Sequence, residues 1–379
     1  MTRTAALLDR LVRHETVSSR SNLDLVEEVE ALLRSLGART ARLPDAQAPK
    51  AGLYAEIGPP GPGGLLLSAH SDVVPVEGQD WSRAPFRLSR EADRLYGRGT
   101  TDMKGFLAAM LAAAERAAGR DLTAPLKLVI SYDEEVGCVG IARMLGRLAS
   151  LVGSPDLAIV GEPTEMQVAT GHKGKRAYRA LIRGEAGHSA LAPHFVNALY
   201  VAAEFVGRLK ALGDDLARDG GRDEAYSVAH STLHVGMLNG GRALNIVPDH
   251  AEIVFEIRYL TEDDPNVLEQ RIRHAADGCA AAHGPGAAIE VAEINAYPGL
   301  EVTDAKAIEI VTAAALTGTC KVPFGTEAGF FSGLGIPTLV CGPGSMAAQG
   351  HTPDEFITDG HLAACAAVLD RIVSRMTGA

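Results

Sequence analysis

Histidines and carboxylates with the chemistry of a metal site occur in several separate segments of the chain. The residues concerned are His70 and Asp72, Asp102, the pair Glu134 and Glu135, Glu162, and His351. Three of these segments follow a short apolar run that is typical of a strand. Their placement suits an open α/β sheet, which carries its chemistry just outside the carboxyl ends of the strands. Two imidazoles and several carboxylates form a ligand set for a pair of zinc-like ions, so the pattern predicts a metallohydrolase.

The first two segments allow both a chemical and a structural interpretation. His70 and Asp72 lie two residues apart at a strand end, so both side chains can point to the same side. The Asp72 carboxylate could then accept the second ring N–H of a metal-bound His70. Asp102 lies in the glycine-rich turn 97–105, where its two oxygens could bridge two cations. Taken alone, however, the first pair could be a surface feature, and Asp102 could be the N-cap of the following helix.

The adjacent glutamates Glu134 and Glu135 suggest a division of roles. Neighbouring carboxylates near a cavity repel each other unless cation charge offsets the repulsion. One glutamate could bind metal while the other moves a proton, since a free glutamate beside an activated water is the general base of metal-assisted amide hydrolysis. The alternative is a solvated pair at a helix start, and Glu162 and His351 could each be loop residues. The metal-site prediction therefore depends on the combination of segments and their order.

Composition limits the class of protein. A chain of 379 residues exceeds one ordinary core, so two domains are expected. Hydrophobic content of 46% and charged content of 22% are typical of a globular enzyme. The net charge of -11 gives no basic surface for nucleic acid or anionic membrane, so neither partner is expected. The five cysteines form no CxxC pair, and the N-terminal segment lacks a signal peptide's apolar core, which predicts a cytoplasmic protein.

The hydrophobic pattern predicts the elements that position these residues. Helical periodicity alternates with short apolar runs in the first half of the chain, which predicts a mostly parallel α/β sheet. The expected helices are 4–14, 22–36, 103–118 and 139–151, and the expected strands are 65–68, 126–132 and 156–160. From about residue 175 the pattern becomes β-α-β-β-α-β, with helices expected over 194–212 and 263–282. We therefore predict a domain formed by residues 1–175 and 289–379, interrupted by an inserted α+β, ferredoxin-like domain over 176–288.

Read together, several motifs resemble those of a known enzyme family. The motifs SAHSDVVP, YGRGTTDMKG, DEEVG, VGEPT and GHTPDEF resemble the zinc-dependent amidohydrolase family of aminoacylases, acetylornithine deacetylases and succinyl-diaminopimelate desuccinylases. The resemblance covers nearly the whole chain in the right order. It implies a zinc-peptidase-like catalytic domain and an inserted lid domain that carries a homodimer contact. It also implies two Zn²⁺ ions, for which Co²⁺ can substitute.

The resemblance also implies roles for individual residues. The implied metal ligands are His70 and Glu162 for one ion, Glu135 and His351 for the other, and Asp102 as the bridge between them. Asp72 would orient the first histidine, and Glu134 would be the general base. Ordinary chemistry agrees with this assignment, because zinc polarises an acyl carbonyl and lowers the pKa of water.

Three further residues fall in the inserted domain. His188, in Gly-His-Ser, resembles the family's histidine that stabilises the oxyanion in the active site of the neighbouring subunit, although a loop histidine is the alternative. Asn245 and Arg258 resemble substrate contacts. Arg258 suits a substrate α-carboxylate because a guanidinium binds carboxylates bidentately, and its alternative is a surface ion pair.

The C-terminal segments narrow the expected substrate. Residues 324–328, 341–345 and 351–355 resemble the acetylornithine deacetylase branch, which implies hydrolysis of N2-acetyl-L-ornithine, a small N-acylated amino acid, to L-ornithine and acetate in arginine biosynthesis. Glu327 would then face the side-chain ammonium. The alternatives are a broad N-acyl-amino-acid amidohydrolase or dipeptidase, a desuccinylase, and a metal-binding protein on a retired hydrolase scaffold. Retention of Glu134, which is not needed to hold metal, counts against the last of these.

Overall fold

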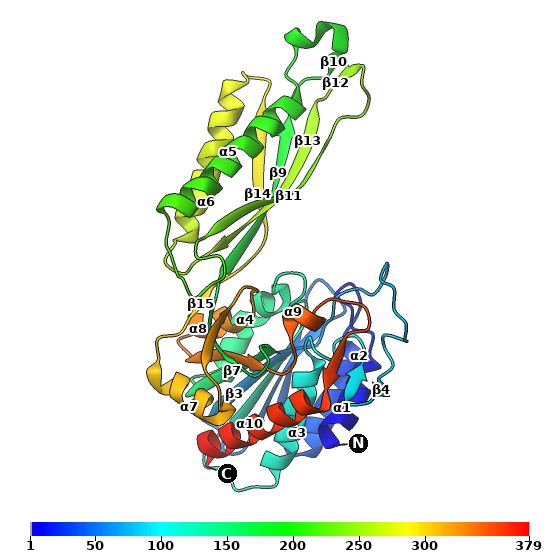
Figure 1. The fold of residues 1–379 in the computed structure, drawn as a ribbon, viewed down its shortest axis with the longest axis vertical. Coiled ribbons are helices and arrows are strands. Elements are labelled where there is room, and N and C mark those ends of the chain that lie inside the picture. The colour runs from blue at the N-terminus through cyan, green and yellow to red at the C-terminus, as the bar shows by residue number, and fades with distance from the viewer. Residues whose placement is uncertain (1, 379) are drawn as a thin grey trace. The chain divides into compact units, whose positions relative to one another are not determined.

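The computed structural model describes residues 2–378, and the chain divides into two compact units (Figure 1). Unit 1 comprises the chain up to His172, Leu300–Val322 and the chain from Thr326 onward. Unit 2 comprises Lys173–Gly299 and Pro323–Gly325. Among the described residues, no helix has both the length and the apolar character needed to cross a bilayer.

A nine-stranded sheet forms the centre of unit 1, with the order β1-β2-β6-β3-β7-β17-β8-β15 and with β16 beside β8. Its central strands β6, β3, β7 and β17 are mutually parallel, whereas β1 and β2 are antiparallel. The bounds are β1 Arg39–Pro44, β2 Ala51–Ile57, β3 Leu65–His70, β6 Leu126–Ser131, β7 Leu157–Pro163, β8 Val168–His172, β15 Leu300–Glu301, β16 Thr319–Val322 and β17 Thr338–Gly342. The predicted mostly parallel α/β sheet is therefore confirmed.

Helices pack on this sheet because each buries its apolar face against the apolar side chains of the strands. One core joins α1 (Arg3–Val12), α2 (Leu23–Ser35), α3 (Lys104–Ala118) and α10 (Asp359–Thr377) to the strands. Alanines occupy half of the buried positions of α3, so neighbouring elements can approach this helix closely. On the other face, Met144 of α4 (Val139–Val152) lies directly over Gly52, where a Cβ would come within 2.5 Å of its sulfur. The remaining helices of unit 1 are α7 Ala305–Ala315, α8 Ala328–Gly333 and α9 Met346–Gln349.

A small three-stranded sheet connects two segments that are far apart in the sequence. Strand β5 (Arg94–Tyr96) lies between β4 (Ser89–Glu91) and β18 (Phe356–Thr358), and Tyr96 pairs with Phe356. The glycine-rich turn follows β5, and the loop that contains His351 precedes β18. This pairing therefore brings both segments to the same part of unit 1.

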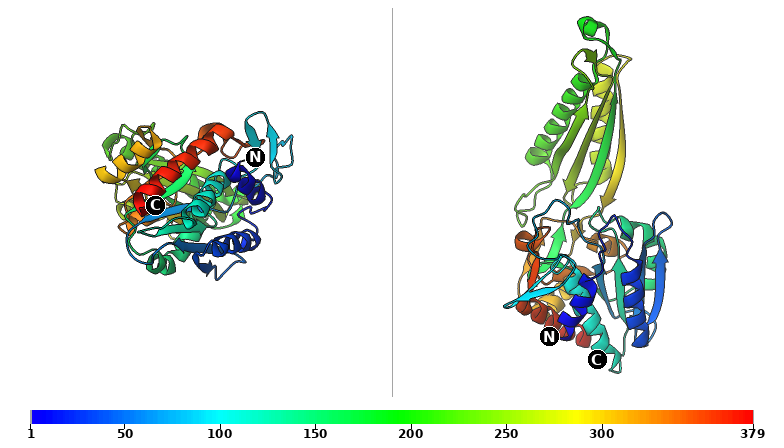
Figure 2. Two further views of the ribbon diagram at one scale, coloured as in Figure 1. Left: turned by 90° about the horizontal axis from the view of Figure 1, so that it is seen from below. Right: turned by 90° about the vertical axis from the view of Figure 1, so that its right-hand side faces the viewer.

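Unit 2 has the predicted order of elements, β-α-β-β-α-β. Its antiparallel sheet has the order β11-β13-β9-β14, and α5 and α6 pack against one face (Figure 2). Burial alternates along β13, which is why its sequence HAEIVFEIRY reads as a strand with one buried face. The bounds are β9 Gly174–Arg183, α5 Ala198–Asp219, β11 Thr232–Gly240, β13 His250–Tyr259, α6 Pro265–Ala282 and β14 Ala288–Tyr297.

The first helix of unit 2 begins later than the periodicity predicts. A 3-10 segment, Ser189–His194, precedes it and contains Pro193. Asn197 then accepts a hydrogen bond from the backbone N–H of Leu199 and caps α5, which starts at Ala198 instead of residue 194.

Candidate metal centre

The carboxyl ends of three neighbouring parallel strands bring the first ligand candidates together. His70 ends β3, Glu162 lies near the end of β7, and Glu134 and Glu135 follow β6. The Nε2 atom of His70 lies 3.6 Å from Glu162 Oε1. The imidazole and carboxylate ligand atoms of His70, Glu134 and Glu162 all lie within 4.8 Å of one another. The strand-end placement inferred from sequence therefore produces an actual cluster.

Asp102 lies between the two histidines. Its Oδ1 is 3.1 Å from His70 Nε2, and its Oδ2 is 3.3 Å from His351 Nε2. His351 Nε2 also lies 3.0 Å from Glu135 Oε2. One carboxylate thus presents a different oxygen to each imidazole, which is the arrangement that a bridging ligand between two ions needs.

Burial makes this accumulation of negative charge costly in the absence of cations. His70, Asp102 and Glu162 are each less than 5% exposed. Burial, followed by the charge of Asp102, raises the pKa of Glu135 to about 7. Burial also raises the pKa of Glu134 and Glu162 well above the usual range, although the nearby His70 opposes this effect. Cations bound here would take the place of the protons that these carboxylates otherwise hold.

Two buried oxygens support the fit to metal ions. Glu135 Oε1 and Glu162 Oε1 are buried and have no hydrogen-bond partner among the described residues. Buried polar atoms are almost always paired, so an orphaned carboxylate oxygen indicates a missing ligand. Oxygen and imidazole donors without a thiolate match a zinc-like ion of borderline hardness. The residues present therefore fit a pair of divalent cations.

The same carboxylates raise the pKa of both histidines. Although burial lowers the pKa of His70, the charge of Glu162 and the hydrogen bond with Asp102 raise it well above its ordinary value. Hydrogen bonds with Asp102 and Glu135 raise the pKa of His351 to about 10. Both imidazoles thus lie in a field that stabilises positive charge, whether that charge is a proton or a metal ion.

Asp72 makes more contacts than the sequence indicated. His70 Nδ1 is 2.9 Å from the backbone oxygen of Asp72 and 3.6 Å from its carboxylate, so the backbone carbonyl is the nearer acceptor. The carboxylate accepts hydrogen bonds from Ser18 Oγ and from the backbone N–H groups of Glu134 and Glu135, at 2.7, 3.1 and 3.3 Å. Asp72 therefore ties the end of β3 to the turn that carries both glutamates.

Sequence reasoning assigned no role to Glu355, which holds the turn before Asp102. Glu355 is fully buried and accepts hydrogen bonds from the backbone N–H groups of Gly99, Thr101 and Asp102, at 2.9, 2.7 and 3.1 Å. Arg98, which is 1% exposed, donates to it at 2.8 Å. The only signal in the sequence was its position in the GHTPDEF motif, since no spacing rule connects it to a turn more than two hundred residues away.

Glu327 is buried in unit 1 near the cluster. It is 1% exposed and accepts a hydrogen bond from Ser131 Oγ at 2.8 Å. Its Oε1 has no partner among residues 2–378. Burial raises its pKa to about 7, against the hydrogen bond from Ser131. This carboxylate could therefore accept one more donor.

The remaining candidate residues lie in unit 2. His188 is exposed, and its Nδ1 accepts a hydrogen bond from the backbone N–H of Ala190 at 3.1 Å. It pairs with Ile246 in the short ladder of β10 (Gly187–His188) and β12 (Ile246–Val247), next to exposed Asn245. Arg258 Nε donates to Glu256 at 2.8 Å, so it makes the ion pair that was its alternative interpretation.

The fold and the centre define an α/β protein with an acidic, histidine-containing candidate metal site. The family model described as Peptidase family M20/M25/M40 matches residues 66–375, and the chain belongs to this family. It is 35% identical over 347 residues to an acetylornithine deacetylase of Klebsiella pneumoniae, covering 90% of this chain and 88% of that one.

Solved structures share the fold. The M20 family metallo-carboxypeptidase Sso-CP2 from Sulfolobus solfataricus aligns with a TM-score of 0.81 at 20% identity, covering 98% of this chain and 99% of that one. The YXEP protein of Bacillus subtilis, described as a dinuclear metal-binding peptidase from the M20 family, aligns with a TM-score of 0.70 at 16% identity. It covers 98% of this chain and 96% of that one. The chain thus belongs to a peptidase family and shares the fold of its solved members.

Proposed function

We propose that the protein removes the acetyl group from N2-acetyl-L-ornithine, giving L-ornithine and acetate, as a cytoplasmic step of arginine biosynthesis. The observation that carries this proposal is the cluster around Asp102, with Glu134 beside it, in a chain that is 35% identical to an acetylornithine deacetylase over most of its length. The five cysteines are free, which suits a reducing compartment.

Two zinc ions would be held at the centre, with Co²⁺ as a possible substitute. The ligands we assign are His70 and Glu162 for one ion, Glu135 and His351 for the other, and Asp102 between them. The 3.6 Å separation of the first pair and the 3.0 Å separation of the second support this division. When bound, such ions polarise an acyl carbonyl and make water more acidic.

Glu134 is the residue we assign to proton transfer. It adjoins the ligands, and its Oε1 accepts a hydrogen bond from Cys138 Sγ at 3.4 Å. It would take a proton from the attacking water and deliver it to the amide nitrogen, so that the C–N bond breaks with a neutral amine as the leaving group. Asp72 supports this role because it holds the backbone of the same turn.

Residues of unit 2 would bind and polarise the substrate. We assign the α-carboxylate to Arg258, with Asn245 as a further contact, and the developing oxyanion to His188 of a neighbouring subunit. A homodimer through unit 2 is supported by exposed apolar side chains near β10 and β12, which are Leu191, Tyr200, Leu244 and Ile246 at 53, 69, 100 and 45% exposure. Strand β11 also forms an open edge of its sheet and is exposed along most of its length.

A panel of amides tests the proposed reaction. Protein stripped with chelator should be inactive, and zinc should restore hydrolysis of N-acetyl-L-ornithine in preference to N-acetyl-L-methionine and N-succinyl-diaminopimelate. Preference for acetylmethionine would identify a general aminoacylase, and no turnover with zinc bound would contradict enzymatic function. In the same panel, Glu327→Gln should raise KM for acetylornithine more than for acetylmethionine. Equal changes would remove Glu327 from substrate selection.

A further inference from the structure

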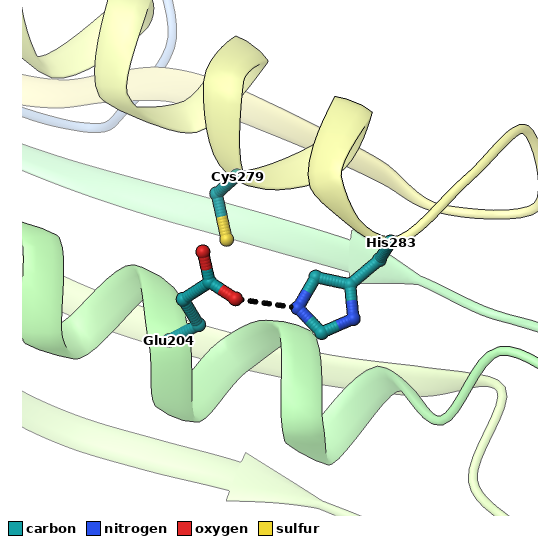
Figure 3. Close-up of side chains that lie close together, drawn as sticks. All are labelled: Glu204, Cys279 and His283. Atoms are coloured by element: carbon teal, nitrogen blue, oxygen red, sulfur yellow. Dashed lines mark hydrogen bonds and ion pairs between the residues drawn. The ribbon is translucent and has the colours of Figure 1, made fainter.

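A second group of metal-binding side chains lies wholly within unit 2, on its two helices (Figure 3). Cys279 lies in the last turn of α6, and His283 is the C-cap residue that follows the helix four positions later. Glu204 faces them from α5. The thiol, imidazole and carboxylate ligand atoms of the three residues all lie within 4.8 Å of one another.

Existing contacts already aim these side chains at a common point. His283 Nε2 lies 2.8 Å from Glu204 Oε2, whereas Arg208 donates to the other oxygen, Oε1, at 2.7 Å. Cys279 is fully buried, and its thiol donates a hydrogen bond to the backbone oxygen of Val201 at 3.5 Å. Arg208 thus orients the carboxylate through Oε1 and leaves Oε2 facing the histidine.

We propose that Glu204, Cys279 and His283 bind one divalent cation of the zinc type, which ties α5 to the end of α6. Thiolate, imidazole and carboxylate are all zinc ligands, and water would fill the fourth position. The ion replaces the proton between His283 and Glu204 and the thiol proton of Cys279, and both protons leave to solvent.

The geometry requires a small adjustment. With bond lengths of about 2.0–2.3 Å, ligands of a tetrahedral zinc lie about 3.5 Å apart, so rotation of the partly exposed Glu204 and His283 side chains by roughly 1 Å completes the site. Their partial exposure also provides an entry path for the ion. The guanidinium of Arg208 reduces the net negative charge, which favours a softer, thiolate-binding ion over calcium or magnesium. The site does not depend on the proposed hydrolysis, because none of its residues belongs to the catalytic centre.

Cobalt titration of the full-length, metal-stripped protein tests this proposal. The ligands assigned at the catalytic centre include no thiolate, so a near-ultraviolet thiolate-to-cobalt absorption band reports on Cys279. Cys279→Ser should abolish the band and leave hydrolysis unchanged, whereas Cys320→Ser, at a cysteine of unit 1, should retain it. Absence of the band from the wild type, or its persistence in Cys279→Ser, would overturn the proposal.

Two further variants test whether Glu204 and His283 bind the ion together with Cys279. Glu204→Gln and His283→Asn should each weaken the cobalt titration that produces the band by roughly tenfold or more, because each removes a ligand. Both residues are at the surface of the helix pair, so the variants should fold. Unchanged cobalt affinity in both would show that Cys279 binds without them and would overturn the site.

Discussion

Among single residues, Glu134 and Glu135 are adjacent in sequence but differ in their contacts. Glu135 Oε2 lies 3.0 Å from His351, whereas Glu134 meets the thiol of Cys138. We therefore expect Glu134→Gln to lower kcat by about 10²–10⁴-fold with zinc content unchanged, because it removes the proposed general base alone. Glu135→Gln should instead lower zinc affinity. Steady-state kinetics with metal analysis distinguishes the two, and loss of zinc from Glu134→Gln would contradict the assignment.

Glu355 should behave as a positioning residue. Its carboxylate compensates the buried Arg98 and accepts three backbone N–H groups around Asp102. Glu355→Gln leaves Arg98 without a charged partner, which we expect to cost about 3 kcal/mol of unfolding free energy. Zinc affinity should fall by roughly tenfold or more because Asp102, the proposed bridging ligand, loses its support.

Chelator competition and urea unfolding measure both effects of the Glu355 substitution. Asp354→Asn is the matched control, since the Asp354 carboxylate accepts hydrogen bonds from the backbone N–H and hydroxyl of Ser82 instead of from the turn backbone. Equal losses of zinc affinity in the two variants would show that Glu355 has no specific effect on Asp102.

For the secondary-structure elements, a polar cluster joins the end of β1 to α4 and the turn after β6. Asp45 accepts hydrogen bonds from Tyr132 Oη at 2.9 Å and Arg143 Nη1 at 2.8 Å. Although burial opposes the effect, the backbone N–H of Gln47 and these two side chains lower the pKa of Asp45 to about 2. Tyr132 directly precedes the segment with the two glutamates, so the cluster anchors part of the site.

The lowered pKa of Asp45 predicts a pH-dependent contribution to stability. Because the folded pKa lies below the unfolded value of about 3.9, the contribution is complete above about pH 5 and disappears as pH falls toward 2. It amounts to roughly 2 kcal/mol. Asp45→Asn should therefore be less stable than the wild type at pH 7, and the difference should shrink between pH 5 and 2 in urea unfolding. A constant difference over that range would contradict this.

The elements show which parts of the fold a single sequence could predict. The strands before His70 and Glu134 and the following helices were predictable because their apolar runs and turn residues agree locally. Strand β2, with the sequence AGLYAEI, was not predicted, since alanine and glycine have low strand propensity and the strand is buried on both faces. Helix α10 was also not proposed, although it packs in the same core as α3.

The residues of the site also fall into those that the sequence could predict and those that it could not. Ligand candidates at strand ends follow from the rule that parallel strands place their carboxyl ends together. His351 lies in a loop with a φ of 60°, and the pairing of β18 with β5 brings it near Asp102. That pairing is non-local, so neither His351 nor Glu355 could be placed by periodicity or spacing. The prediction of His351 depended on resemblance to known motifs, and no role was predicted for Glu355.

At the scale of the whole molecule, mixed dimers can test whether His188 acts in the active site of the partner subunit. If His188 acts in the partner's active site, Glu134→Gln and His188→Ala chains are each inactive as homodimers, but a mixed dimer contains one complete site. That site combines Glu134 of the His188→Ala chain with His188 of the Glu134→Gln chain. Random re-association should restore roughly a quarter of wild-type activity, since half the dimers are mixed and each has one working site.

The mixing experiment has a control that depends on the exposed apolar surface of unit 2. Leu244 is fully exposed in the single chain, so Leu244→Asp should disfavour a contact there without disturbing the core. Leu316→Asp, at an exposed position in unit 1, is the matched variant and should have no effect on association. Placing Leu244→Asp in both chains should abolish rescue and give monomers by light scattering. Full activity of a monomeric Leu244→Asp enzyme would show that His188 is not needed from a partner and would return its role to the subunit that carries it.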